Sequence, residues 1–311
     1  MLQYLIILLD DTSTSFCHYE SNKFARRLMP IDILRKGIRF GMMENLMIQF
    51  VYPDYELPPE YAELIESIDH SKIKPVWSVA DVVVLNDISD VATDMPDVPI
   101  VLRMGKKDLT THVDALVEMM DKTLRLNIVL TDVETFSDDD FADYKIVLER
   151  LSKKIEQMYV AGKSPQLNLL TDRMMLKEMN NCGAGETNIT LAPNGKFYIC
   201  PAFYYEDETD SVGDLEHGLD IKNKQLYKLD HAPICRHCDA YQCKRCIWLN
   251  RKTTLEVNTP SHEQCVLAHL ERNASRDLLN SIRKHGTFLP EQEDIKEIDY
   301  LDPFDKRDEW Q

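Results

Sequence analysis

The chain has 311 residues, of which 44% are hydrophobic and 29% are charged, a composition typical of a globular protein with a buried core. Its formal net charge of −17 argues against nucleic acid or an anionic membrane as the main partner, and it is compatible with a cationic peptide or protein. No stretch has the length and low charge of a membrane helix, and the apolar start at residues 2–9 has no basic region before it, so we expect a cytoplasmic protein.

Residues 2–170 alternate β-rich runs with amphipathic helical stretches, which is the pattern of βα units around a parallel sheet. Six runs are predicted to be strands: residues 3–9, 46–51, 82–85, 100–102, 127–130 and 166–170. Six such units fit a partial barrel, and they also fit an open doubly wound sheet. The residues alone leave both arrangements open.

Two helices in this region have clear sequence signals. Pro30 lies near the start of the first, and apolar residues between positions 31 and 40 supply its buried face before Asn45. A later helix spans residues 141–158, where apolar residues recur at intervals of three and four with charged residues between them.

Polar residues follow nearly every predicted strand. They are Asp10, Asp11, Tyr52, Asp54, Asn86, Asp87, Arg103, Asp132, Glu134, Asp172 and Arg173. In a βα barrel this rim is where sites form, so the set predicts a polar cavity. For any single residue the alternative is that Asp and Asn end strands and cap the following helices.

The pattern changes after residue 180. The β-rich runs 187–192 and 196–200 flank Pro193-Asn194-Gly195, which predicts a hairpin. Residues 231–246 are too few and too rich in thiols to fold by burial alone, so they need a metal to order them. A helix is predicted over residues 262–284, and the acidic tail at 291–311 is expected to be mobile or loosely packed.

Seven of the eight cysteines lie between positions 182 and 265, which is enough thiolate for two metal centres. They are Cys182, Cys200, Cys235, Cys238, Cys243, Cys246 and Cys265. In a reducing compartment such clusters favour metal ligands over disulfides, the alternative being buried reduced thiols. Seven ligands fit poorly into one tetrahedral zinc site, so we favour two iron–sulfur clusters and keep zinc as the alternative.

The stretch from Cys182 to Cys265 resembles the SPASM domain, the auxiliary-cluster module of radical SAM peptide-modifying enzymes. That domain has one cysteine, a hairpin with Gly-x4-Cys, a Cys-x2-Cys-x5-Cys-x3-Cys run and a last cysteine. This chain has four residues instead of five before Cys243, and two instead of three before Cys246. The resemblance implies two [4Fe–4S] clusters, one held by Cys182, Cys200 and Cys246, the other by Cys235, Cys238, Cys243 and Cys265.

With three protein ligands, the first of these clusters would have one open position. An open iron can bind a substrate thiolate or amide, or a small exogenous thiol. Alternatively, Cys17 in the first βα loop completes the ligand set.

The six βα units resemble the radical SAM partial barrel, whose Cys-x3-Cys-x2-Cys loop should follow the first strand. Here residues 10–20 hold Cys17 alone, so we do not expect the chain to cleave S-adenosylmethionine or to use it as a cofactor. Cys17 and His18 fit either a metal or redox pair, or a small loop thiol beside a surface imidazole.

The fold class predicted is therefore α/β, a partial (βα)6 radical-SAM-like barrel followed by a small cysteine-rich SPASM-like domain. The predicted boundaries are residues 1–178 for the degenerate barrel, 179–285 for the iron–sulfur domain and 286–311 for the acidic C-terminal tail.

The whole chain, with its segment 49–56 and the stretch 246–272, resembles the CXXX-repeat peptide maturase family, which accompanies small precursor peptides with spaced cysteines. The resemblance implies an iron–sulfur protein that modifies a cysteine-containing ribosomal peptide after translation. Its mechanism would be capture of a substrate thiolate at the first cluster, with electron transfer through the second. One alternative is a non-catalytic peptide-binding partner of a true radical SAM enzyme. The other is a structural zinc protein whose polar barrel rim binds an unrelated small molecule.

Overall fold

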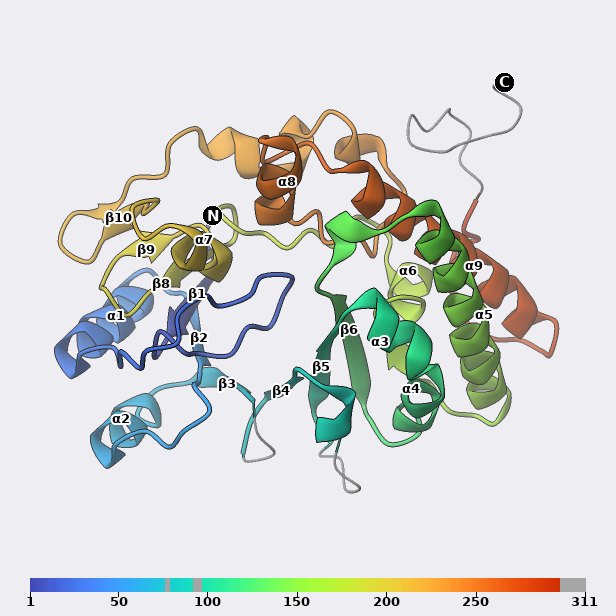
Figure 1. Cartoon of the computed structure of the whole chain (residues 1–311), viewed down its shortest axis with the longest axis horizontal. Helices are drawn as coiled ribbons and strands as arrows, with labels where there is room; N and C mark the ends of the chain where they lie inside the picture. The colour runs from blue at the N-terminus through green and yellow to red at the C-terminus, as the bar shows by residue number, and fades with distance from the viewer. Residues whose placement is uncertain (76–78, 92–96, 297–311) are drawn as a thin grey trace.

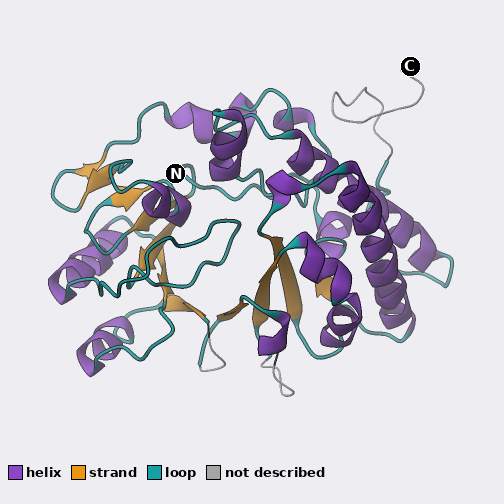
Figure 2. Ribbon diagram, in the orientation of Figure 1, coloured by secondary structure: helices purple, strands orange, loops and turns teal. Residues whose placement is uncertain are grey.

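The computed structural model describes residues 1–75, 79–91 and 97–296. Within this part of the chain, one curved sheet runs through the molecule and helices flank it (Figures 1 and 2). Its strand order is β7-β6-β5-β4-β3-β2-β1-β8-β9, and the pairs from β7 to β1 are all parallel. The parallel strands are β1 (Tyr4–Leu8), β2 (Met47–Val51), β3 (His70–Lys74), β4 (Val82–Leu85), β5 (Pro99–Met104), β6 (Arg125–Leu130) and β7 (Gln166–Leu167).

Helices and short 3-10 turns connect these strands, as crossovers between parallel strands require. They are α1 (Ile31–Met43), α2 (Pro59–Ile65), η1 (Ile88–Asp90), α3 (Lys106–Thr111), α4 (Val113–Met119), η2 (Val133–Thr135), α5 (Asp138–Val160) and α6 (Thr171–Met175). The core lies between the sheet and these helices. Leu5, Ile7 and Leu8 of β1 have no exposed surface there.

The six strands predicted from the sequence correspond to β1, β2, β4, β5, β6 and β7, so an ordered series of βα units is confirmed. The structure adds β3, whose sequence His70-Ser71-Lys72-Ile73-Lys74 holds a single apolar residue. The helix predicted after Pro30 is α1, and the one predicted over 141–158 is α5, which begins three residues earlier behind a capping box at Ser137.

The sheet continues beyond β1 into the cysteine-rich part of the chain. Strand β8 (Asn188–Leu191) pairs in parallel with β1, and β9 (Phe197–Tyr198) pairs antiparallel with β8. The hairpin predicted at Asn194-Gly195 is thereby confirmed, and Gly195 takes the positive φ of 77° that such a turn needs. Helix α1 covers this joint. A side chain at Gly37 would collide with Leu191 of β8, so glycine allows the close approach.

The remaining chain passes over one side of the sheet, mostly as loops and short helices (Figure 2). Its elements are α7 (Pro201–Glu206), β10 (Gly213–Asp214), β11 (Gly218–Leu219), η3 (Lys224–Tyr227), η4 (Leu229–His231), η5 (Cys235–His237), α8 (Ile247–Thr254) and α9 (His262–Arg283).

Helix α9 matches the helix predicted over residues 262–284 and lies beside α5, so the end of the chain returns to the barrel (Figure 1). Of the tail predicted to be mobile, residues 297–311 lie outside the described part. None of the described helices combines the length and apolar composition needed to cross a bilayer.

Candidate metal centre

Three of the predicted ligands, Cys182, Cys200 and Cys246, are brought together from distant parts of the chain. Cys200 follows β9 and occupies the N-cap position of α7, while Cys246 occupies that of α8. Cys182 lies before β8, and its backbone N–H donates to the carbonyl of Lys244 at 3.0 Å. All three cysteines pack partly buried against the same apolar core.

Backbone N–H groups point at the sulfurs of these cysteines. The N–H groups of Ala202 and Phe203, in the first turn of α7, interact with Cys200, and that of Leu249 interacts with Cys246. Cys182 receives two, from Ala184 and from Ile247, and the latter directly follows Cys246. Such N–H···S contacts stabilise thiolate charge and are among the means by which proteins tune iron–sulfur clusters.

The thiols of Cys182, Cys200 and Cys246 lie in electrostatic range of one another. Burial raises the pKa of Cys246 well above its usual value, and Cys182, Cys200 and Cys17 raise it further. Burial also raises the pKa of Cys200, followed by the effects of Cys182 and, more weakly, Cys17. Buried thiolates that lie in range of one another repel and are costly to form. A bound metal neutralises their charge and lowers that cost.

The other predicted ligands form a second group. Cys235, Cys238 and Cys243 lie in and after η5. Burial raises the pKa of Cys243 to about 12, a backbone N–H lowers it, and the nearby Cys235 and Cys238 raise it again. The N–H of Ala240 donates to Cys238 Sγ at 3.4 Å, and that of Arg245 to Cys243 Sγ at 3.4 Å.

Cys265 approaches this second group through α9. It lies in the first turn of that helix, four residues before His269, so both residues lie on one face. His269 Nε2 lies 3.5 Å from Cys238 Sγ. The face of α9 that carries Cys265 is therefore the face turned toward the cysteine loop.

Arg245 is a buried cation in range of both cysteine groups. Its side chain is 2% exposed, Nε donates to Asn181 Oδ1 at 3.2 Å, and Nη2 donates to the carbonyl of Tyr227. Nη1 is buried with no hydrogen-bond acceptor among the described residues. Burial raises the pKa of Cys182 in one group and of Cys235 in the other, and the charge of Arg245 partly offsets the rise in both.

The donor set fits an iron–sulfur cluster chemically. A buried guanidinium with an unused donor is costly unless negative charge lies nearby, and ligated thiolates and sulfides would supply it. The described residues contain no trio of His, Cys, Asp or Glu side chains placed to hold a single metal ion.

The polar residues after the strands are mostly engaged in structural contacts. Arg103 donates to Asn86 Oδ1 at 2.7 Å, Asp132 accepts from the N–H of Lys106 at 3.0 Å, and Asp172 pairs with Arg125 at 2.7 Å. These contacts match the alternative that such residues end strands and fix the following elements.

His18 does not face the thiols through Nδ1. That nitrogen donates to the carbonyl of Leu130 at 2.7 Å, and burial lowers the pKa of the ring. His18 is half-buried rather than fully at the surface, because the loop packs against the end of β6.

Sequence reasoning missed Arg245, His269 and Tyr19 as members of the site. Arg245 lies inside Cys243-x2-Cys246, and the spacing of four between Cys265 and His269 was visible as a helix-face pattern. Tyr19 had no such signal, because its proximity to Cys200 depends on the fold.

No family model matches the chain, and no curated protein matches it. Solved structures of anSMEcpe resemble it. One with bound AdoMet gives a TM-score of 0.60 at 13% sequence identity, over 90% of this chain and 96% of that chain. Another, with bound AdoMet and Cp18Cys peptide, gives a TM-score of 0.60 at 14% identity, over 91% of this chain and 99% of that chain. At this identity the likeness is one of fold, and it confirms the predicted α/β class, in which βα units around a parallel sheet are followed by a smaller cysteine-rich part.

Proposed function

We propose that this chain is an iron–sulfur protein of a peptide-maturation system, acting in the post-translational modification of a cysteine-containing ribosomal peptide. The observation that carries the proposal is the convergence of Cys182, Cys200 and Cys246 in one buried group whose sulfurs face backbone N–H donors. The fold it shares with a structure that holds AdoMet and Cp18Cys peptide supports the choice of a peptide as substrate.

The two cysteine groups would hold two [4Fe–4S] clusters within a SPASM-like unit of residues 179–285. Cys182, Cys200 and Cys246 serve the first, and Cys235, Cys238, Cys243 and Cys265 the second. Such clusters supply one-electron transfer at potentials set by burial and by hydrogen bonds to sulfur.

The chain's own residues would hold charge and exclude water around these centres. Arg245 lies in electrostatic range of one thiol from each group, so it favours negative charge on both. The chain's net charge of −17 favours a cationic peptide as partner, because opposite charges steer encounter.

We do not propose that this chain cleaves S-adenosylmethionine. The loop after β1 offers Cys17 where three cysteines would be needed for that chemistry. A separate radical SAM enzyme is therefore a candidate partner, and the degenerate barrel of residues 1–178 would serve peptide binding in the cytoplasm.

The proposal is tested by purifying the chain without oxygen and measuring iron, sulfide and zinc. We expect about eight irons per chain with matching sulfide and broad visible absorption, since two cubane clusters hold that number. Cys182→Ala and Cys235→Ala should each lose about half of the iron, because each removes a ligand from one group only.

Stoichiometric zinc without iron would instead identify the cysteines as a structural zinc site. Incubation with cysteine-rich precursor peptides, followed by mass spectrometry, separates the remaining alternatives. Binding without a mass change, with modification only when a radical SAM enzyme is added, would identify a non-catalytic partner.

A further inference from the structure

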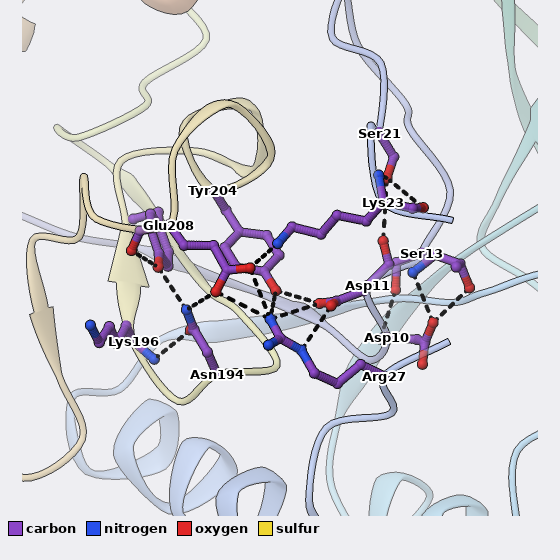
Figure 3. A network of polar contacts seen from close by, with 12 residues as sticks. Asp10, Asp11, Ser13, Ser21, Lys23, Arg27, Asn194, Lys196, Tyr204 and Glu208 are labelled. Carbon is purple, nitrogen blue, oxygen red and sulfur yellow. Dashed lines mark hydrogen bonds and ion pairs between the residues drawn. The ribbon is translucent and has the colours of Figure 1, made fainter. Parts of the chain in front are cut away.

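The loop between β1 and α1 is held against helix α7 and the residues that follow it (Figure 3). Arg27 pairs with Asp11 at 2.8 Å, and its Nη2 donates to the Tyr204 hydroxyl at 2.7 Å. Tyr204 lies on α7 and also donates to Asp11. Glu208, just after α7, pairs with Lys23 and Arg27 of the loop. The start and the end of the loop are thus both fixed to the element that begins at Cys200.

The middle of the same loop is held from the barrel by Arg103 of β5. Its side chain is 4% exposed. Nε donates to the carbonyl of Cys17 at 2.8 Å, and Nη2 donates to the carbonyl of Tyr19 at 2.6 Å. The ring of Tyr19 stacks on Tyr205 of α7, with centroids 5.5 Å apart and planes 20° apart. Contacts on both sides therefore fix the backbone at Cys17.

This position brings the Cys17 thiol to the first cysteine group. Cys17 packs against the same apolar core as Cys182, Cys200 and Cys246. Burial raises its pKa to about 12, and Cys182 is the next largest cause. Cys200 and Cys246 in turn both lie in electrostatic range of Cys17.

The hydroxyl of Tyr19 also indicates that a hydrogen-bond acceptor belongs near Cys17 and Cys200. This hydroxyl is buried with no hydrogen-bond partner within the described residues. Cys17 and Cys200 both contribute to the rise of its pKa, after burial and the nearby Tyr205. A buried hydroxyl of this kind is costly unless it donates to a group in the space between those sulfurs.

We propose that Cys17 is the fourth protein ligand of the centre held by Cys182, Cys200 and Cys246. The proposal rests on the iron–sulfur part of the proposed function and completes its first ligand set as four cysteines, the usual set for a [4Fe–4S] cluster. It closes the iron position that the three SPASM-like cysteines would leave open. The first βα loop thereby acquires a ligand role different from that of a Cys-x3-Cys-x2-Cys loop.

The test compares the wild-type chain with Cys17→Ala, both purified without oxygen. Iron, sulfide and the electron paramagnetic resonance spectrum of the reduced protein are measured before and after addition of cyanide. In the wild type, cyanide should leave the spectrum unchanged, because cysteine occupies every iron of the first cluster. In Cys17→Ala, cyanide should shift the signal of one cluster, because one iron has lost its cysteine.

Two further variants keep the test decisive. Ser15→Ala lies in the same loop, where its hydroxyl accepts from the N–H of Ser21 at 3.2 Å, and it should behave as the wild type. Cys17→Ser nearly preserves the side-chain volume, so it covers the case in which the alanine variant fails to fold. Its serine oxygen should change the signal of one cluster and leave the other unaltered.

The outcomes separate this inference from the proposed function. If the wild type holds iron–sulfur clusters and both Cys17 variants give the same spectra and cyanide responses as the wild type, only the role of Cys17 is overturned. A wild type that already responds to cyanide as the alanine variant does would overturn it too. A wild type without iron would remove the proposed function and this inference together.

Discussion

At the scale of single residues, Arg245 has the most consequential environment. Its guanidinium is buried, donates to Asn181 and Tyr227, and keeps Nη1 without an acceptor among the described residues. A cation of this kind depends on nearby negative charge for its stability. Its position between Cys243 and Cys246 places that charge where ligated thiolates would be.

We expect Arg245→Met to destabilise the chain by about 3 kcal/mol, because two buried hydrogen bonds to a charged donor are lost. The variant should also lose iron to a chelator faster than the wild type. Arg245→Lys should fall between them, since it keeps the charge but loses the planar fork. Urea unfolding and the rate of chelator-dependent bleaching measure both effects.

Arg236→Met is the matched control. Arg236 is exposed and lies in the same cysteine loop, so its replacement should change stability by less than about 0.5 kcal/mol. Equal behaviour of the two methionine variants would show that the buried guanidinium has no special role.

The four cysteines from Cys235 to Cys246 form a local pattern in the sequence, and Arg245 and His269 lay within reach of the same reasoning, while the role of the cysteines as ligands stays a prediction. Tyr19 was not predictable, and Arg103 was predicted only as one of the polar residues that follow the strands. They approach Cys17 through stacking and hydrogen bonds between elements distant in the chain, and such contacts have no counterpart in local periodicity.

At the scale of elements, Glu271 joins three parts of the fold. It lies on α9 and accepts hydrogen bonds from Tyr144 of α5 at 2.8 Å and from Gln242 of the cysteine loop at 3.2 Å. Burial raises its pKa to about 7, although both hydrogen bonds lower it. Helix α9 thus places the Glu271 carboxyl group between the barrel and the cysteine loop. This group holds a proton more tightly in the folded chain than in the unfolded chain.

The contribution of Glu271 to stability should therefore fall as pH rises from about 4.5 to 7. In this window the folded chain keeps the Glu271 proton that the unfolded chain has lost, so rising pH favours unfolding. The loss is of the order of 3 kcal/mol, from a shift of about two and a half pKa units. Urea unfolding at several pH values measures it.

Glu271→Gln should remove most of this dependence because glutamine does not titrate. Glu263→Gln, on the first turn of the same helix, should retain it. The same slope in both variants would contradict a role for Glu271.

Element type was predictable where the period was strong, as in α1, α5 and α9. Strand β3 was not, because only Ile73 of its five residues is apolar and buried. Hydrogen bonds to β2 and β4 on both sides hold this polar segment as a strand, so tertiary context overrides its composition.

At the scale of the whole molecule, the sheet crosses the predicted boundary at residues 178 and 179. Strand β1 pairs on one side with β2 and on the other with β8 from the cysteine-rich part. Helix α9 then packs against α5. The barrel and the cysteine-rich part therefore share a core.

We expect thermal unfolding to show one transition, with circular dichroism and visible absorption of the anaerobic protein changing together. The shared sheet makes loss of either part expose the core of the other. A loss of visible absorption well before the loss of secondary structure would indicate instead that the cysteine-rich part unfolds independently.

The order of the βα units was predictable, but the extension of their sheet by β8 was not. Residues 187–192 predicted a strand of a hairpin, and nothing local showed that its free edge would meet β1. Pairing between segments so far apart depends on the shape of the assembled barrel.

The same pairing of β1 with β8 governs what happens while the protein is being made. The first strand leaves the ribosome about 180 residues before its second neighbour, which at about 5–20 residues per second is a delay on the order of ten to forty seconds. During that time one edge of an apolar strand has no partner, and such edges promote aggregation. Synthesis at low temperature or with chaperones should therefore raise the yield of folded chain.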